Sequence, residues 1–187
     1  MNETLKIAIF SPKGGSGKTF HALNLCAHYQ QKGLKVGLID LDPQGSSLFF
    51  AKRQKTTPAF LGDINVFKSG AIPKELDVLI LDLPPSMDYI PNPKEFLIVM
   101  PFLADVLSVA SFMKAKQKLE GQFFIPVLNR MNWQKRLCRD VLKDMKNVCV
   151  VADCEAAKVA ASQFKTVFED YSSKKVARQI EYLAHVI

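Results

Sequence analysis

Short apolar runs alternate with helix-length stretches along the chain. The runs are rich in Ile, Val, Leu and Phe and mostly lack strict apolar–polar alternation, which is typical of strands covered on both faces. They predict strands at Leu5–Phe10, Val36–Leu41, Ile64–Phe67, Val78–Leu83, Phe96–Met100, Phe123–Leu128 and Val148–Val151. The remaining stretches predict helices at Lys18–Lys32, Gly45–Arg53, Ala104–Lys118, Trp133–Lys146, Glu155–Phe168 and Ser173–Ile187.

This alternation predicts an α/β fold with a doubly wound, mainly parallel sheet and helices on both faces. With 187 residues, 48% of them apolar, the chain suits one domain over residues 1–187. Ligands of such folds bind at the carboxyl ends of the strands, so the residues that follow each predicted strand are the candidates for a site. The segment from Pro84 to Pro93 contains four prolines and is predicted to be a loop.

A glycine-rich segment follows the first predicted strand and leads into the first predicted helix. It reads Lys13-Gly14-Gly15-Ser16-Gly17-Lys18-Thr19. Its glycines allow backbone conformations that turn N–H groups inward, where they and the helix N-terminus can hold phosphate oxygens. Lys18 would reach the β- and γ-phosphates, and the Thr19 hydroxyl would bind Mg²⁺. The common phosphate loop has glycine where this chain has Pro12, so the match is to a variant loop.

The segment KGGSGKT, with its second lysine at position 13, resembles the deviant Walker A box of the ParA/MinD family of ATPases. The resemblance implies that Lys13 reaches across a dimer to phosphates bound by the other subunit. ATP in one subunit then lacks full neutralisation until the partner supplies that charge, so two ATP-loaded copies close face to face and open when the γ-phosphate is lost. The nucleotide-binding residues expected here are Lys13, Gly14, Gly15, Ser16, Gly17, Lys18, Thr19 and Phe20.

Acidic residues lie at the carboxyl ends of the second and fourth predicted strands. Asp40-Leu41-Asp42-Pro43-Gln44-Gly45 resembles the family's second signature box, and alternation along the strand would point Asp40 and Asp42 the same way. The resemblance implies that Asp42 orients the attacking water, as a catalytic residue beside Lys13 and Lys18, while Asp40 supports the metal. Asp82 ends an apolar run like a Walker B box and would hold Mg²⁺ through water. The expected metal site is Thr19, Asp40 and Asp82; the alternative is that Asp40 and Asp42 only cap the end of their strand.

Two further segments resemble parts of the family, and two depart from it. Pro101 with Asp105 resembles the proline loop, and Asn129-Arg130 resembles an Asn-Arg pair whose amide can pair with the adenine edge; the alternative is a polar loop start. Phe20 replaces a hydroxyl residue that contacts the α-phosphate, which is expected to weaken or alter nucleotide binding. In the segment after the last strand, where relatives often carry arginine, this chain has Ala152-Asp153-Cys154-Glu155, so the resemblance does not extend to that surface.

The charge distribution favours a polyanionic partner. Lys and Arg number 25 against 18 Asp and Glu, for a net charge of +7. Paired by a two-fold axis, a basic segment could follow a DNA backbone without reading its sequence. The alternative is a solvated helix face. The basic residues between positions 114 and 146 are Lys114, Lys116, Lys118, Arg130, Lys135, Arg136, Arg139, Lys143 and Lys146, against Glu120, Asp140 and Asp144.

The C-terminal stretch has apolar residues at helical spacing, namely Val176, Ile180, Leu183 and Ile187. A MinD-like membrane-targeting helix would look similar, but we expect a helix that closes the fold, since the family needs one here. The four cysteines lack the CxxC spacing of a zinc site and are expected to be reduced cytosolic thiols. No leader, membrane span or N-terminal DNA-binding module is expected.

The resemblance implies a cytoplasmic, nucleoid-associated ParA-like ATPase with ATP and Mg²⁺ as cofactors. Its ATP-bound homodimer would bind DNA non-specifically and drive plasmid or chromosome partition or cargo positioning, and its slow hydrolysis would be stimulated by a ParB-like partner or other cargo adaptor. The alternatives are a MinD-like membrane-cycling regulator, a nucleotide-binding switch with little hydrolysis, which Phe20 keeps open, and a metabolic P-loop ligase or kinase, against which Lys13 argues.

Overall fold

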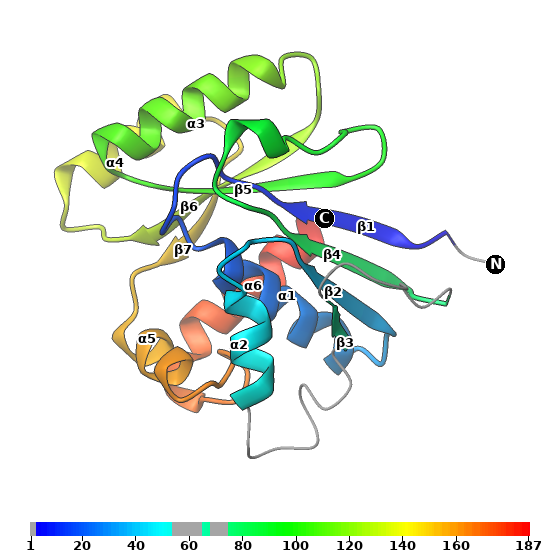
Figure 1. Cartoon of the computed structure of the whole chain (residues 1–187). Helices are drawn as coiled ribbons and strands as arrows, with labels where there is room; N and C mark the ends of the chain where they lie inside the picture. Colours follow the sequence, from blue (N-terminus) through cyan, green and yellow to red (C-terminus); the bar gives the residue numbers. More distant parts are fainter. Residues whose placement is uncertain (1–2, 54–64, 68–74) are drawn as a thin grey trace.

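Residues 3–53, 65–67 and 75–187 are described by the computed structural model, and they contain one seven-stranded sheet (Figure 1). The strand order is β3-β2-β4-β1-β5-β6-β7, and every neighbouring pair is parallel. The strands are β1 (Leu5–Ile9), β2 (Val36–Asp40), β3 (Asn65–Phe67), β4 (Val78–Asp82), β5 (Leu97–Leu103), β6 (Phe124–Met131) and β7 (Cys149–Ala152).

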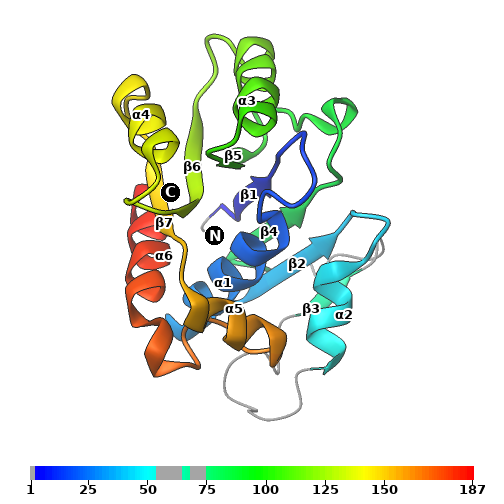
Figure 2. The same ribbon diagram turned by 90° about the vertical axis from the view of Figure 1, so that its left-hand side faces the viewer.

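Helices cover both faces of this sheet. Figures 1 and 2 show α3 and α4 side by side on one face, and α1, α2, α5 and α6 on the other. The helices are α1 (Lys18–Gln31), α2 (Ser46–Arg53), α3 (Val106–Lys118), α4 (Arg136–Asp144), α5 (Glu155–Ser162) and α6 (Lys174–Val186), with short 3₁₀ turns η1 (Met87–Tyr89) and η2 (Tyr171–Ser173).

Each face of the sheet has its own apolar core. Along β1, Ile7 and Ile9 belong to the core beneath α1 and α6, whereas Ala8 and the following Phe10 belong to the core beneath α3 and α4. All four are fully buried, because successive side chains of a strand point to opposite faces and both faces are covered. The predicted α/β fold with a doubly wound parallel sheet is therefore confirmed.

Two strands run further than their apolar patterns predicted. Pro101 was expected in a loop after its strand but lies inside β5, because β1 pairs with β5 only as far as Val99 and the edge beyond it tolerates a proline. Asn129 and Arg130 were expected after their strand but lie inside β6. The pairing of β6 with β7 shifts register between Leu128 and Met131, and Arg130 there has a φ of 52°.

The C-terminal half also differs in its helix ends. The helix expected over Glu155–Phe168 ends at Ser162, and Phe164 has a φ of 57°, which a continuing helix does not allow. The helix expected from Trp133 begins at Arg136. Ile64, the first residue of one predicted strand, lies outside the described residues.

Candidate nucleotide-binding site

The glycine-rich segment forms a turn between β1 and α1, as the sequence predicted. Gly15 and Gly17 have φ values of 74° and 100°, which favour glycine. Gly17 is also the N-cap of α1, so the loop passes directly into the N-terminus of that helix. Backbone N–H groups and the positive end of a helix dipole therefore meet at one place, which is the arrangement that holds phosphate oxygens.

Asn129 fastens this loop to β6. Its Nδ2 donates a hydrogen bond of 2.9 Å to the carbonyl oxygen of Ser16, and its side chain is buried. A Cβ on Gly17 would lie 2.1 Å from that same Nδ2. One amide N–H of Asn129 is therefore used to bind the loop. The sequence did not reveal that Asn129 positions the loop.

Asp82, at the end of β4, is the buried acid at the centre of the site. Its Oδ2 accepts hydrogen bonds from the hydroxyls of Thr19, at 2.8 Å, and Ser47, at 2.7 Å. Its Oδ1 is buried and has no hydrogen-bond partner among the described residues. Burial raises the pKa of Asp82 to about 6, against the two hydroxyl hydrogen bonds that favour its ionised form. A buried carboxylate oxygen without a partner, beside two hydroxyls, fits the oxygen-rich surroundings of a hydrated Mg²⁺.

Asp40 and Asp42 have different hydrogen-bond partners and different exposure to solvent. Asp40 ends β2 opposite Asp82, and its carboxylate accepts hydrogen bonds from the backbone N–H groups of Asp42, at 3.2 Å, and Leu48, at 3.0 Å. Asp42 lies beyond the strand, is partly exposed, and accepts from the N–H of Gln44. Asp40 therefore holds the turn that leads into α2, and Asp42 is the acid with access to solvent.

The two lysines of the loop have different surroundings. Lys18 is buried, and burial lowers its pKa although Asp82 and Asp42 act in the opposite direction. Lys13 is partly exposed, and its Nζ lies 2.6 Å from Oδ1 of Asp105 in the same chain. Lys18 is thus buried among the acids of the site, whereas Lys13 is partly exposed and paired with an acid at the start of α3.

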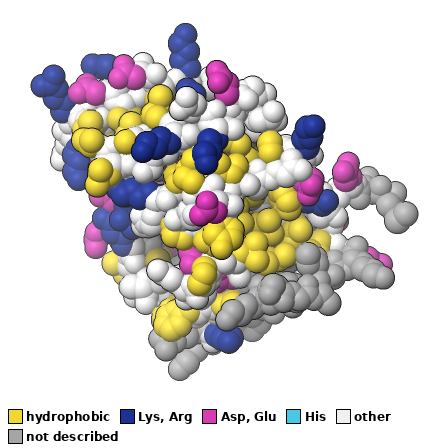
Figure 3. Space-filling model, turned by 45° about the horizontal axis from the view of Figure 1, so that its top comes forward, with side chains coloured by type: hydrophobic (Ala, Val, Ile, Leu, Met, Phe, Trp, Pro, Cys, Tyr) yellow, Lys and Arg dark blue, Asp and Glu magenta, His cyan; other side chains and the backbone are white. Residues whose placement is uncertain are grey.

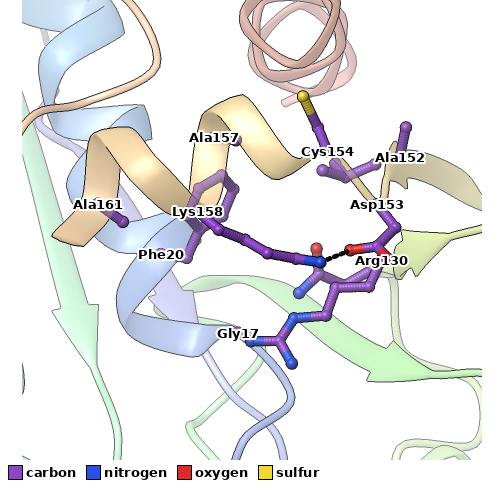
Figure 4. Close-up of a pocket in the computed structure, with 11 residues that line it drawn as sticks. Gly17, Phe20, Arg130, Ala152, Asp153, Cys154, Ala157, Lys158 and Ala161 are labelled. Atoms are coloured by element: carbon purple, nitrogen blue, oxygen red, sulfur yellow. Dashed lines mark ion pairs between the residues drawn. The ribbon is translucent and has the colours of Figure 1, made fainter. Parts of the chain in front are cut away.

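A cavity of about 280 Å³ opens beside Gly17. Phe20 forms part of its wall, and Figure 4 shows the Lys158 side chain running from beside Phe20 to Asp153, near Arg130. The Nζ of Lys158 and the Oδ1 of Asp153 form an ion pair 2.7 Å apart. A cavity next to the phosphate loop, with small apolar and a few polar side chains, is of the kind that receives a nucleobase. The remaining lining residues are Asn129, Val151, Ala152, Cys154, Ala157 and Ala161.

The structure brings most predicted residues to one end of the sheet. The loop residues 13–19 and the acids Asp40, Asp42 and Asp82 meet there, and Phe20, Asn129 and Arg130 line the adjoining cavity. The sequence did not single out Ser47, Asp153 or Lys158 as site residues. Ser47 lies two residues after the segment Asp40–Gly45, and this closeness could have indicated it. Lys158 lies in an alanine-rich helix in which no sequence signal marks it.

The profile of the CobQ/CobB/MinD/ParA nucleotide-binding domain matches residues 7–186. The chain belongs to this family. Within it, a curated relative, the chromosome-partitioning ATPase Soj of Thermus thermophilus, is 50% identical over 42 residues. That match covers 22% of this chain and 17% of Soj, so the chain corresponds to only part of the curated relative.

Solved structures of this family share the fold over nearly the whole chain. The ATP complex of a variant of McdA from Cyanothece has a TM-score of 0.78 at 18% identity, covering 100% of this chain and 98% of McdA. A putative plasmid partition protein of Borrelia burgdorferi bound to AMPPNP has a TM-score of 0.73 at 17% identity, covering 99% and 100%. At these identities the likeness establishes the P-loop α/β fold. Among the described helices, none is long and apolar enough to cross a membrane.

Proposed function

We propose that this member of the ParA/MinD family is an ATP-dependent dimerising switch that binds DNA non-specifically and positions a plasmid, a chromosome or another cargo. The observation that carries the proposal is the different burial of the two loop lysines. Lys18 is buried, while Lys13 is partly exposed. A second ammonium group placed at the surface can neutralise phosphates held by another copy of the chain.

The surroundings of Lys13 support an association between two copies. Val106 and Leu107, in the first turn of α3, are 75% and 70% exposed and follow directly after Asp105, which contacts Lys13. Large apolar side chains beside a charged contact are typical of surfaces that a partner covers. An isologous dimer would place this turn of each copy against the other.

Within one subunit, the chain supplies the groups that nucleotide hydrolysis needs. The loop backbone and Lys18 would hold the phosphates, and Thr19 with Asp82 would hold a hydrated Mg²⁺, which supplies charge neutralisation on the phosphate oxygens. Asp42 is the acid in reach of solvent and would orient water. Asp40 uses its carboxylate on two backbone N–H groups, so we assign it a supporting role in placing Asp42. Turnover is expected to be slow until a partner such as a ParB-like protein completes the site.

The basic residues between positions 114 and 146 support a DNA surface. All nine of these lysines and arginines are exposed, and they lie mainly on α3 and α4 and the segments beside them. Figure 3 shows Lys and Arg side chains spread among apolar ones on this side of the molecule. In a dimer two such surfaces would act together, which favours sequence-independent contacts with phosphates.

The experiment that tests the switch is light scattering of the protein with Mg²⁺ and either ADP or ATP. We expect the mass to double with ATP and to stay monomeric with ADP. The Asp42→Ala variant, which lacks the acid that orients water, should remain dimeric after ATP addition while the wild type returns to monomer. A mass that does not rise with ATP at any protein concentration would contradict the switch. The DNA function is tested separately by gel shift at low salt, where binding only with ATP and Mg²⁺ is expected.

A further inference from the structure

The contact between Lys13 and Asp105 joins two segments that are 92 residues apart in the sequence. The Nζ–Oδ1 distance is 2.6 Å, and the side chains of Lys13 and Asp105 are 30% and 42% exposed. The ammonium group is therefore engaged by an acid of its own chain, at the surface where the proposed function requires it to meet phosphates of another copy.

Asp105 is held in place independently of Lys13. It is the N-cap of α3, and the same Oδ1 accepts a hydrogen bond of 2.9 Å from the backbone N–H of Ser108. Lys13, in contrast, reaches Asp105 through a long side chain with several rotatable bonds. The lysine can leave while the carboxylate stays with the helix N-terminus, where a negative charge is stabilised. The contact can thus open without unfolding the start of α3.

One ammonium group cannot remain in this ion pair and also bind a phosphate of a second copy. We propose that Asp105 is a positioning residue that holds Lys13 within its own subunit and thereby raises the protein concentration at which ATP-loaded copies associate. The proposal rests on the proposed dimerising function. In a two-fold symmetric dimer Lys13 must leave Asp105 in both subunits, so the free-energy cost of opening the ion pair applies twice.

The size of the effect follows from the exposure of the pair. Both side chains are partly open to water, so the ion pair is screened and contributes modestly rather than blocking association outright. Two of these ion pairs open when one dimer forms. Removing the ion pair should therefore lower the protein concentration at half-association by about 3- to 10-fold. Asp105 therefore sets a threshold for association and does not forbid it.

The main test is the Asp105→Ser variant, since serine still caps a helix but carries no charge and has a shorter side chain. With Mg²⁺ and ATP, we expect its half-association concentration in analytical ultracentrifugation to be about 3- to 10-fold below that of the wild type. Asp105→Asn, which keeps the cap and a neutral acceptor, should fall between the two. The matched control is Asp170→Ser, which removes an aspartate from the N-cap of η2; it should behave like the wild type.

A second measurement tests the contact between Lys13 and Asp105 directly, in the monomer. Amine labelling of the nucleotide-free monomer, followed by mass spectrometry, should modify Lys13 several-fold faster in Asp105→Ser than in the wild type, with exposed Lys32 as the internal reference. A purely structural role of Asp105 in capping α3 would leave this rate unchanged, because serine preserves the cap.

The possible outcomes separate this proposal from the proposed function. If the wild type does not associate with ATP at any concentration, the dimerising switch itself is wrong. If the wild type associates but Asp105→Ser needs the same or a higher concentration, the switch stands and the restraint by Asp105 is wrong. Faster labelling of Lys13 together with association at lower concentration supports the restraint; unchanged labelling overturns it.

Discussion

A side chain at Gly17 would strain the phosphate loop. Its φ is 100°, and a Cβ would lie 2.1 Å from Nδ2 of Asn129, which is bonded to the Ser16 carbonyl. We expect Gly17→Ala to lower the free energy of unfolding by about 2–4 kcal/mol, through backbone strain and the loss of that hydrogen bond. Chemical denaturation measures this change. Gly14→Ala is the control, because its Cβ meets open space and its φ is not positive; equal losses in the two variants would contradict the explanation.

At this scale the sequence predicted residue types better than contacts. The positions of Lys18, Thr19 and Asp82 followed from order along the chain and from family resemblance, and the structure places them together. The contacts of Asp82 with Ser47, of Asn129 with Ser16 and of Lys13 with Asp105 join residues 35, 113 and 92 positions apart. Pairing at such separations depends on how strands and loops are placed in space, which a local pattern does not contain.

The helix α2 is tied to the site by its first turn. The Ser47 hydroxyl donates to Asp82 at 2.7 Å, and the Leu48 N–H donates to Asp40 at 3.0 Å. We expect Ser47→Ala to destabilise the protein by about 1–2 kcal/mol, because it removes a buried hydrogen bond to an acid. Nucleotide affinity in the presence of Mg²⁺ should fall more than affinity without it, since the carboxylate then loses one of the groups that orient it. Calorimetric titration with and without Mg²⁺ checks this. Ser46→Ala, a change in the neighbouring, partly exposed residue, should alter neither quantity.

The helix α6 completes the core. Val176, Ile180 and Leu183 are fully buried against the sheet and α1, so the expectation of a closing helix is confirmed. Ile180→Ala should cost about 2–5 kcal/mol of unfolding free energy, as a cavity in a packed core does. Arg178→Ala, on the exposed side of the same helix, should change it by less than about 0.5 kcal/mol. Thermal unfolding followed by calorimetry compares the two variants.

The same helix allows a test of the membrane alternative. A MinD-like targeting helix would have to leave the core to present its apolar face to lipid. With that face buried, ATP-dependent co-sedimentation of the folded protein with anionic liposomes is not expected. Sedimentation that requires ATP and disappears when the exposed Lys174 and Lys175 are replaced by Gln would favour the membrane alternative instead.

Element boundaries were predicted less well than the elements themselves. Apolar runs located all the described strands, because a strand buried on both faces has few polar positions. The ends of β5 and β6 were placed too early, since Pro101 and Asn129 were interpreted as loop residues. Both interpretations rest on local sequence rules alone. The residue at which a strand ends depends instead on which neighbouring strand continues the pairing.

For the whole molecule, the alternation of strands and helices was sufficient to predict the architecture. Parallel strands joined by helices admit few arrangements, and all of them gather the carboxyl ends of the strands at one edge. The order of the strands and the position of α3 and α4 on the same face were not predicted. Because both helices cover this face, the exposed basic residues of two separate helices lie on one side of the molecule.

The salt dependence of DNA binding tests that surface directly. Each phosphate neutralised by a lysine contributes about 0.9 to the slope of log K against log salt, so Lys114→Gln with Lys118→Gln should reduce the slope by up to about 1.8 per subunit. Both side chains are exposed on α3. Fluorescence anisotropy with ATP, Mg²⁺ and two duplexes of unrelated sequence should show the same reduction for both duplexes, because contacts to phosphates carry no sequence information. The control pair, Lys32→Gln with Lys35→Gln, removes the same charge near the amino end of β2, away from α3 and α4. If the control lowers the slope as much as the test pair, binding follows net charge alone, and α3 is not part of a DNA surface.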